Sequence, residues 1–277
     1  MTTYAVPKRL GPLPTGGAGF LTATTQTAKR TILQYGRTPQ LLVMPIVTGV
    51  LFMVVFRYVL GGAIHTGVGH GYVDFLVPGF LAQTVMWSAM GVAAGVAEDS
   101  NSGVHDRLRS LPVPRAAPVI GRSLADLAIN LPGLGVIAGL GFATGFRAHG
   151  SAGAVTAGFG LIALELYAAI WLFIAFGLVA RNAQAAQGLA GVIVLPFAFV
   201  SAAFVPVNSM PSWLRAFAAH QPFTVVINAV RSLMLGGTGA AGVGHTTSYW
   251  VGFSLLWLAG IAVVSGGLAV FQFSRAR

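Results

Sequence analysis

The sequence has no cysteine and few charged residues. The absence of cysteine excludes a disulfide scaffold, a thiolate zinc site and a cysteine nucleophile. Charged residues make up 8% of the 277 residues and hydrophobic residues 55%, whereas soluble domains carry about 25% charged residues. So few charges cannot cover the surface of a soluble fold of this size, which excludes a water-soluble globular enzyme and a disordered protein. The composition predicts an all-α polytopic membrane protein.

Lysine is scarce, and the motifs of common catalytic sites are missing. A phosphate-binding loop reads GxxxxGK[ST], but Lys8 and Lys29 follow Pro7 and Ala28, so any ATP hydrolysis must take place on another chain. The histidines fall outside the predicted spans, and neither HExxH nor GxSxG occurs. These absences argue against an intramembrane enzyme and leave no metal site to propose.

Six stretches are long and apolar enough to cross about 30 Å of hydrocarbon. They are residues 41–60, 75–97, 119–145, 153–180, 187–207 and 247–271. Residues 1–19, rich in glycine and proline, are predicted to form a flexible cytoplasmic tail, and residues 20–277 a single transmembrane domain. Residues 20–38 predict a helix on the membrane surface, with Leu21, Ala28, Ile32 and Tyr35 on one face. A solvated lead-in to the first span is the alternative.

The distribution of basic residues predicts the orientation. Six spans place both termini on one side of the membrane. With the N-terminus in the cytoplasm, twelve of the 16 lysine and arginine residues lie inside, and only Arg57, Arg147, Arg215 and Arg231 lie outside. This satisfies the positive-inside rule. Topology therefore accounts for the net charge of +10, and nucleic acid is not expected as a partner.

The cytoplasmic connection 98–118 is too rich in features to be a simple loop. Val104, Leu108 and Leu111 form an apolar stripe on a short helix that Asn101 or Ser102 could cap. Such a helix suits docking into a groove on a partner. An interfacial helix lying on lipid fits the same pattern.

The external connection 208–246 predicts two short helices of about 9 and 13 residues. Asn208 or Ser209 is expected to cap the first, and Pro222 separates the two. Helices of this length are too short to cross a bilayer and are typical of re-entrant or interfacial elements. Trp213 suits the membrane interface.

Glu165 is the acidic residue nearest the middle of a predicted span. An unpaired carboxylate at that depth is disfavoured. The group is expected to be neutral, to be paired within the bundle, or to face a hydrated cavity. It also raises the hypothesis of a proton-coupled transporter, although no further acid or histidine lies at that depth.

Two segments resemble the motifs of ABC-2 type transporter permeases. The first is Glu98-x4-Gly103-x3-Arg107-Leu108-Arg109-x-Leu111-Pro112-Val113. The second runs from Val205-Pro206 through Met210-Pro211-x-Trp213-Leu214 to His220-Gln221-Pro222 and Ala229-x-Arg231. Both stand in the family's order, and the resemblance is greatest to daunorubicin/doxorubicin-resistance permeases and related actinobacterial lipid exporters. Gln221 stands where many members have asparagine.

The resemblance implies roles for these segments. Residues 20–38 would be the elbow helix and the segment around 100–111 the coupling helix. The residues expected to couple to the ATPase are Glu98, Gly103, Val104, Arg107, Leu108, Arg109 and Leu111. Those expected to form an external gate are Trp213, Arg215, His220, Pro222 and Arg231; a plain interfacial cap is the alternative.

The resemblance also implies the partners. Two permease subunits, identical or homologous, work with two separate ATPase subunits, which bind ATP and Mg, while this chain binds no cofactor. The predicted function is export of a hydrophobic or amphipathic drug or lipid across the plasma membrane. A proton-coupled secondary transporter and, with less support, a membrane-bound enzyme are the alternatives.

Overall fold

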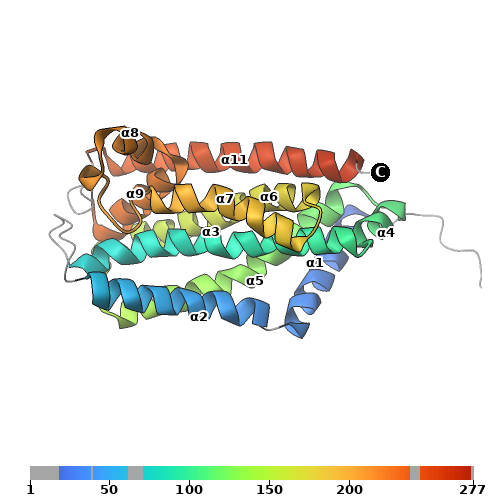
Figure 1. Cartoon of the computed structure of the whole chain (residues 1–277), viewed down its shortest axis with the longest axis horizontal. Helices are drawn as coiled ribbons and strands as arrows, with labels where there is room; N and C mark the ends of the chain where they lie inside the picture. The colour runs from blue at the N-terminus through green and yellow to red at the C-terminus, as the bar shows by residue number, and fades with distance from the viewer. Residues whose placement is uncertain (1–18, 39, 62–70, 238–243, 276–277) are drawn as a thin grey trace, which may run out of the picture.

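A computed structural model describes residues 19–38, 40–61, 71–237 and 244–275. Within these residues the regular elements are all helical (Figure 1). They are α1 (Phe20–Arg37), α2 (Gln40–Val55), the π-helix η1 (Phe56–Leu60), α3 (Tyr72–Asn101), α4 (Val104–Ser110), α5 (Ala116–Ala143), α6 (Ala152–Val179), α7 (Ala183–Phe199), the short 3-10 helix η2 (Val207–Ser209), α8 (Ser212–His220), α9 (Pro222–Leu235) and α11 (Thr247–Arg275). The tail predicted for residues 1–19 lies outside the described residues except for Gly19.

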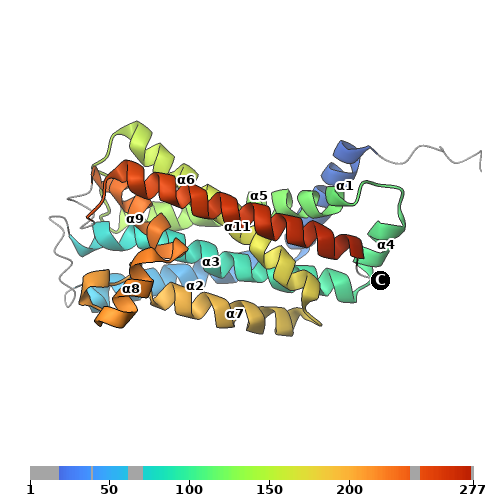
Figure 2. The same ribbon diagram turned by 90° about the horizontal axis from the view of Figure 1, so that it is seen from above.

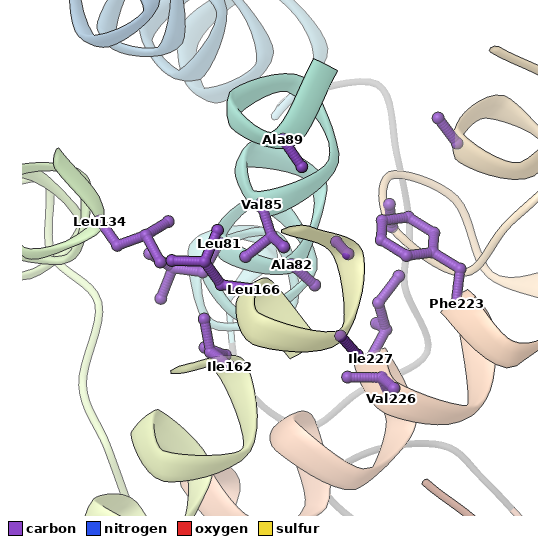
Figure 3. Close-up of a cluster of buried hydrophobic side chains, with 14 of the residues drawn as sticks. Leu81, Ala82, Val85, Ala89, Leu134, Ile162, Leu166, Phe223, Val226 and Ile227 are labelled. Atoms are coloured by element: carbon purple, nitrogen blue, oxygen red, sulfur yellow. The ribbon is translucent and has the colours of Figure 1, made fainter. Parts of the chain in front are cut away.

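Helices α2, α3, α5, α6, α7 and α11 run along the long axis of the molecule (Figures 1 and 2). Helices α1 and α4 lie at one end, together with the end of α11, and α8 and α9 lie at the other. The centre of the core is formed by α3 and α6, where Leu81 and Val85 pack near Leu166 (Figure 3). Ile227 of α9, from the end of the bundle where α8 and α9 lie, belongs to the same cluster.

Four helices are long and apolar enough to cross a membrane: α3, α5, α6 and α11. Two of the predicted spans correspond to shorter apolar helices, Val43–Val59 and Ala183–Phe199. The 17 residues of α7 extend about 25 Å at 1.5 Å per residue. The chain is therefore an all-helical, multi-pass membrane protein, and its long helices match four of the six predicted spans closely.

The predicted fifth span, 187–207, is wrong at its C-terminal end. Helix α7 ends at Phe199, and the chain then turns. The amide of Gln221 donates hydrogen bonds to the carbonyl oxygens of Phe197, at 2.9 Å, and Val200, at 3.0 Å. These bonds satisfy carbonyl groups that a helix leaves free at its end, so a residue more than 20 positions away stabilises the termination.

The helix predicted for residues 20–38 is present as α1, but a different face from the predicted one packs against the bundle. The buried residues are Ala23, Thr24, Thr27 and Thr31. The Thr24 and Thr27 hydroxyls donate to carbonyl oxygens of their own helix, whereas the buried Thr31 hydroxyl has no hydrogen-bond partner among the described residues. The small side chains of this face let it pack closely against other helices. The predicted apolar residues Leu21 and Ile32 are exposed.

The predicted caps of the short helices are also wrong. Gly103, with φ +69°, precedes α4, in place of Asn101 or Ser102. This left-handed conformation favours glycine because it has no Cβ. Asn208 and Ser209 lie in η2, and Pro211 precedes α8. The predicted helix lengths of 9 and 13 residues compare with 9 and 14 in the structure.

Candidate functional site

Helix α4 forms the surface at the end of the bundle opposite α8 and α9 (Figures 1 and 2). Its apolar stripe is divided: Leu108 is half-buried and packs against the core, whereas Leu111, just after the helix, is 52% exposed. Val104 is half-buried, Arg107 is exposed, and the side chain of Arg109 lies outside the described residues. The stripe therefore faces the helical core at Leu108 and the surface at Leu111.

A buried ion-pair network lies beside α4. Asp99, near the end of α3, accepts hydrogen bonds from Arg30 of α1 at 2.7 Å and from Arg122 of α5 at 2.6 Å. Arg122 also donates to Asp126, one turn further along α5, at 2.7 Å. Arg30 is the most exposed member, with 38% of its side chain accessible, while the Asp126 side chain is fully buried. The network joins α1, α3 and α5 directly before α4.

Two further residues fit around this network. A Cβ atom on Gly95 would lie 2.6 Å from Nη2 of Arg122, so a larger residue there would displace the guanidinium from its present position. Burial, together with the charge of Asp126, raises the pKa of Tyr35 on α1 to about 12. Tyr35 therefore stays a neutral hydroxyl beside the ion pairs.

Sequence reasoning missed this network, although a signal was present. Arg122 and Asp126 are spaced i,i+4 at the start of one predicted span, and Asp99 ends the span before it. Antiparallel neighbours bring those two ends together. Opposite charges at the adjoining ends of two neighbouring spans therefore predict an interhelical ion pair. Charges that stand alone in a loop do not predict one.

A cavity of about 710 Å³ lies between α1, α2, α3, α5 and the start of α7. Helix α3 lines it with residues spaced three and four apart, from Trp87 through Gly91 and Gly95 to Glu98. Glu98 was predicted to act in coupling. The structure places it near the end of α3, where it lines this cavity.

The hairpin of α8 and α9 is held by α9, which is buried along most of its length. Arg231 is 1% exposed and donates from Nη2 to the carbonyl oxygens of Phe75, at 2.9 Å, and Ala202, at 3.0 Å. Its guanidinium also lies 3.7 Å from the centre of the Phe75 ring. Arg231 therefore joins α9 to α3 and to the segment after α7.

Helix α8 is more exposed than α9. Trp213 is 74% exposed, and Arg215 donates to the carbonyl oxygens of Asn208 and Met210. The His220 ring lies 2.9 Å from the carbonyl oxygen of Ala216, and Pro222 is the first residue of α9. The predicted gate residues thus share one end of the bundle, but only Arg231 is buried in it.

Glu165 of α6 is 4% exposed. Its Oε2 atom has no hydrogen-bond partner among the described residues, and it does not line the cavity described above. Neither pairing within the bundle nor exposure to that cavity is supported.

Comparison with known proteins identifies the family. The ABC-2 type transporter family matches residues 22–235. The chain belongs to this family. It is 28% identical over 254 residues to the daunorubicin resistance ABC transporter permease DrrB1 of Streptomyces coeruleorubidus, which covers 91% of this chain and 86% of that protein.

The chain is also similar to two ABC transporter permeases of a mycobacterium. The chain is 28% identical over 276 residues to a probable doxorubicin resistance ABC transporter permease, DrrC, of Mycobacterium tuberculosis, covering 98% of this chain and 95% of that protein. It is 29% identical over 184 residues to the permease DrrB of the same species, covering 66% and 63%. The chain is therefore a permease subunit of an ABC transporter, and permeases of this type work with an ATPase partner.

Proposed function

We propose that this chain is the permease of an ATP-driven exporter that moves a hydrophobic or amphipathic drug or lipid out across the plasma membrane. Six spans, α2 with η1, α3, α5, α6, α7 and α11, leave both termini in the cytoplasm. Two copies of a separate ATPase bind ATP and Mg, and a second permease, identical or homologous, completes the path.

The position of α4 carries this proposal. It lies at the end that the positive-inside rule assigns to the cytoplasm, and Leu111 and Arg107 are exposed there. The ion pairs from Asp99 to Arg30 and Arg122 lie directly behind it. A partner that pushes on α4 would therefore move α1, α3 and α5 together.

The opposite end suits a gate. Helices α8 and α9 are too short to cross a bilayer, and Arg231 ties α9 to α3. Movement of α3 would then reach the hairpin through this contact.

Leu111→Asp tests the docking of the ATPase. Burying a leucine contributes about 1.5–3 kcal/mol, so we expect the ATPase to bind about ten- to hundredfold more weakly, while the permease still inserts. Ser110→Asp is the matched control, because it adds the same charge at an exposed neighbouring position. Association is measured by titrating purified ATPase onto the permease in nanodiscs. Equal affinity of Leu111→Asp and wild type would contradict docking at α4.

Proteoliposomes containing the permease and its ATPase test the activity itself. We expect fluorescent drugs or lipids to be moved only when ATP is supplied on the ATPase side, and a Walker-lysine variant of the ATPase to abolish transport. Transport by the permease alone, driven by a proton gradient, would refute the proposal.

A further inference from the structure

Helix α1 carries a basic groove beside the cavity. The groove is lined by Gln26, Lys29, Arg30, Leu33, Gln34, Arg37 and Thr38. None of these residues belongs to the buried face of α1. The groove therefore lies on the part of α1 that the bundle leaves free, on a helix that runs across the direction of the long helices (Figure 1).

Lys29 and Arg37 give the groove its charge. Both side chains are exposed, and neither makes an ion pair with the residues that the structure describes. Arg30 belongs to the ion-pair network beside α4, which holds two positive and two negative groups and is neutral overall. The groove therefore carries two positive charges that no described group compensates.

Glu98 in the neighbouring cavity does not cancel this charge. The cavity and the groove share Gln34 and Thr38, so the carboxylate is counted with the two cations. It makes no ion pair with either of them in the described part of the chain, and one positive charge remains when all three groups are counted. An anion is therefore attracted to the side of α1 where Lys29 and Arg37 lie.

Leu33 stands between the two cations and narrows the choice of anion. Lys29, Leu33 and Arg37 are spaced four residues apart, so they form one row on the helix surface, about 12 Å long. Leu33 is 53% exposed, so a ligand along this row meets an apolar side chain between two positive ones. Free phosphate has no apolar part to place there, whereas an anionic phospholipid has a phosphate for the cations and an acyl chain for the leucine.

The row also lies next to a span. Helix α1 ends at Arg37, α2 begins at Gln40, and the apolar stretch of α2 begins at Val43. Six positions therefore separate Arg37 from the point where the chain enters the hydrocarbon. Basic residues immediately beside a span attract anionic headgroups, and a basic amphipathic helix at the interface buries its apolar side chains among the lipids.

We propose that the row of Lys29, Leu33 and Arg37 binds an anionic phospholipid, with the headgroup phosphate between the two cations and an acyl chain along Leu33. Gln26 and Gln34 supply neutral hydrogen-bond donors to the same headgroup. The lipid is bound on the helix that Arg30 ties to α3 through Asp99. This inference does not depend on what the permease transports.

The test measures lipid binding to the full-length permease in detergent by native mass spectrometry. Phosphatidylglycerol and phosphatidylcholine with the same acyl chains are titrated separately, because they differ in net charge. Lys29→Gln/Arg37→Gln removes two exposed charges and should fold. We expect it to bind phosphatidylglycerol about thirtyfold more weakly, from the contribution of two basic residues beside a membrane, and phosphatidylcholine less than about twofold more weakly.

Arg115→Gln/Arg275→Gln is the matched control. It removes two exposed cations at the same end of the bundle, neither of which lines the groove, and should bind both lipids as wild type does.

A second variant tests the apolar part of the site with both charges in place. Leu33→Gln removes the half-buried apolar surface between the cations, so phosphatidylglycerol should bind about fivefold more weakly. Glycerol 3-phosphate, the headgroup anion without acyl chains, should not displace phosphatidylglycerol from the wild-type permease.

Each outcome decides the proposal. Wild-type affinity for phosphatidylglycerol in Lys29→Gln/Arg37→Gln, equal weakening of both lipids, or the same loss in the Arg115/Arg275 control would overturn it. Displacement by glycerol 3-phosphate, or wild-type affinity in Leu33→Gln, would also overturn it, because the groove would then bind a free anion. Weaker association of the ATPase with Lys29→Gln/Arg37→Gln, at unchanged lipid affinity, would make the groove a protein contact instead.

Discussion

Removing the guanidinium of Arg122 should destabilise the protein more than any single change at its surface. In Arg122→Leu, Asp99 keeps its 2.7 Å contact with Arg30. Asp126 loses the only ion pair that the described residues give it, and its other carboxylate oxygen is already without a hydrogen-bond partner. A fully buried carboxylate is then left without a cation, at a cost of about 3–5 kcal/mol.

The double variant Arg122→Leu/Asp126→Leu distinguishes this mechanism from lost packing. Replacing both members of a buried pair by apolar groups is often neutral or stabilising. We therefore expect the double variant to be more stable than Arg122→Leu, which is the reverse of additive behaviour. Arg115→Leu is the matched control, because this exposed arginine near the start of the same helix makes only a 3.2 Å hydrogen bond to a backbone carbonyl.

Reversible unfolding in mixed micelles, followed by tryptophan fluorescence, measures the free energies of unfolding. Arg115→Leu should stay within about 0.5 kcal/mol of wild type. A loss below about 1 kcal/mol in Arg122→Leu, or a double variant that loses the sum of the two single losses, would show that the ion pairs do not hold these helices together.

Three further changes test other parts of the structure. Arg231→Leu should lower the free energy of unfolding by about 1.5–3 kcal/mol, because the carbonyls of Phe75 and Ala202 lose a charged donor; stability equal to wild type would mean that another group holds α9. Glu165→Leu should be neutral or stabilising, because no described partner is left unpaired, and a loss above about 2 kcal/mol would reveal a partner. Cysteines introduced into this cysteine-free chain at Trp213 and at buried Ala229 should differ: position 213 should label in every nucleotide state, and position 229 only when the hairpin opens. Labelling at 229 that is identical with and without ATP would argue for a static cap.

The sequence was sufficient to predict where the helices are, and the reason is physical. In lipid, a backbone must satisfy its hydrogen bonds within each helix, so the length of an apolar stretch largely determines the element. The predicted spans at 75–97, 119–145 and 153–180 accordingly lie close to α3, α5 and α6. The end of α7 was mispredicted because the stabilising group, the Gln221 amide, comes from beyond the span.

Contacts between helices could not be predicted in the same way. Arg231 contacts a carbonyl 156 residues away, and the buried face of α1 consists of alanine and threonine, residue types with no strong apolar signal. Small and weakly polar residues let helices approach closely in membranes. Which residues of two helices come into contact therefore depends on how the whole bundle packs. Asp99 and Glu98 are an example: they are adjacent in sequence, but Asp99 lies in the ion-pair network and Glu98 lines the cavity.

Helix α3 is the element on which these separate features meet. Its first turn receives Arg231 at the Phe75 carbonyl, its middle and end line the cavity from Trp87 to Glu98, and Asp99 binds the neighbouring helices. Its 30 residues span about 45 Å, and α4 follows after only two residues. Because α3 is packed on α6 through a continuous buried core, a displacement at α4 cannot be absorbed by a flexible connection beside the cavity. The same helix therefore links the ion pairs beside α4, the lining of the cavity and the hairpin of α8 and α9, so loss of Arg231 and loss of Arg122 act on opposite ends of one element.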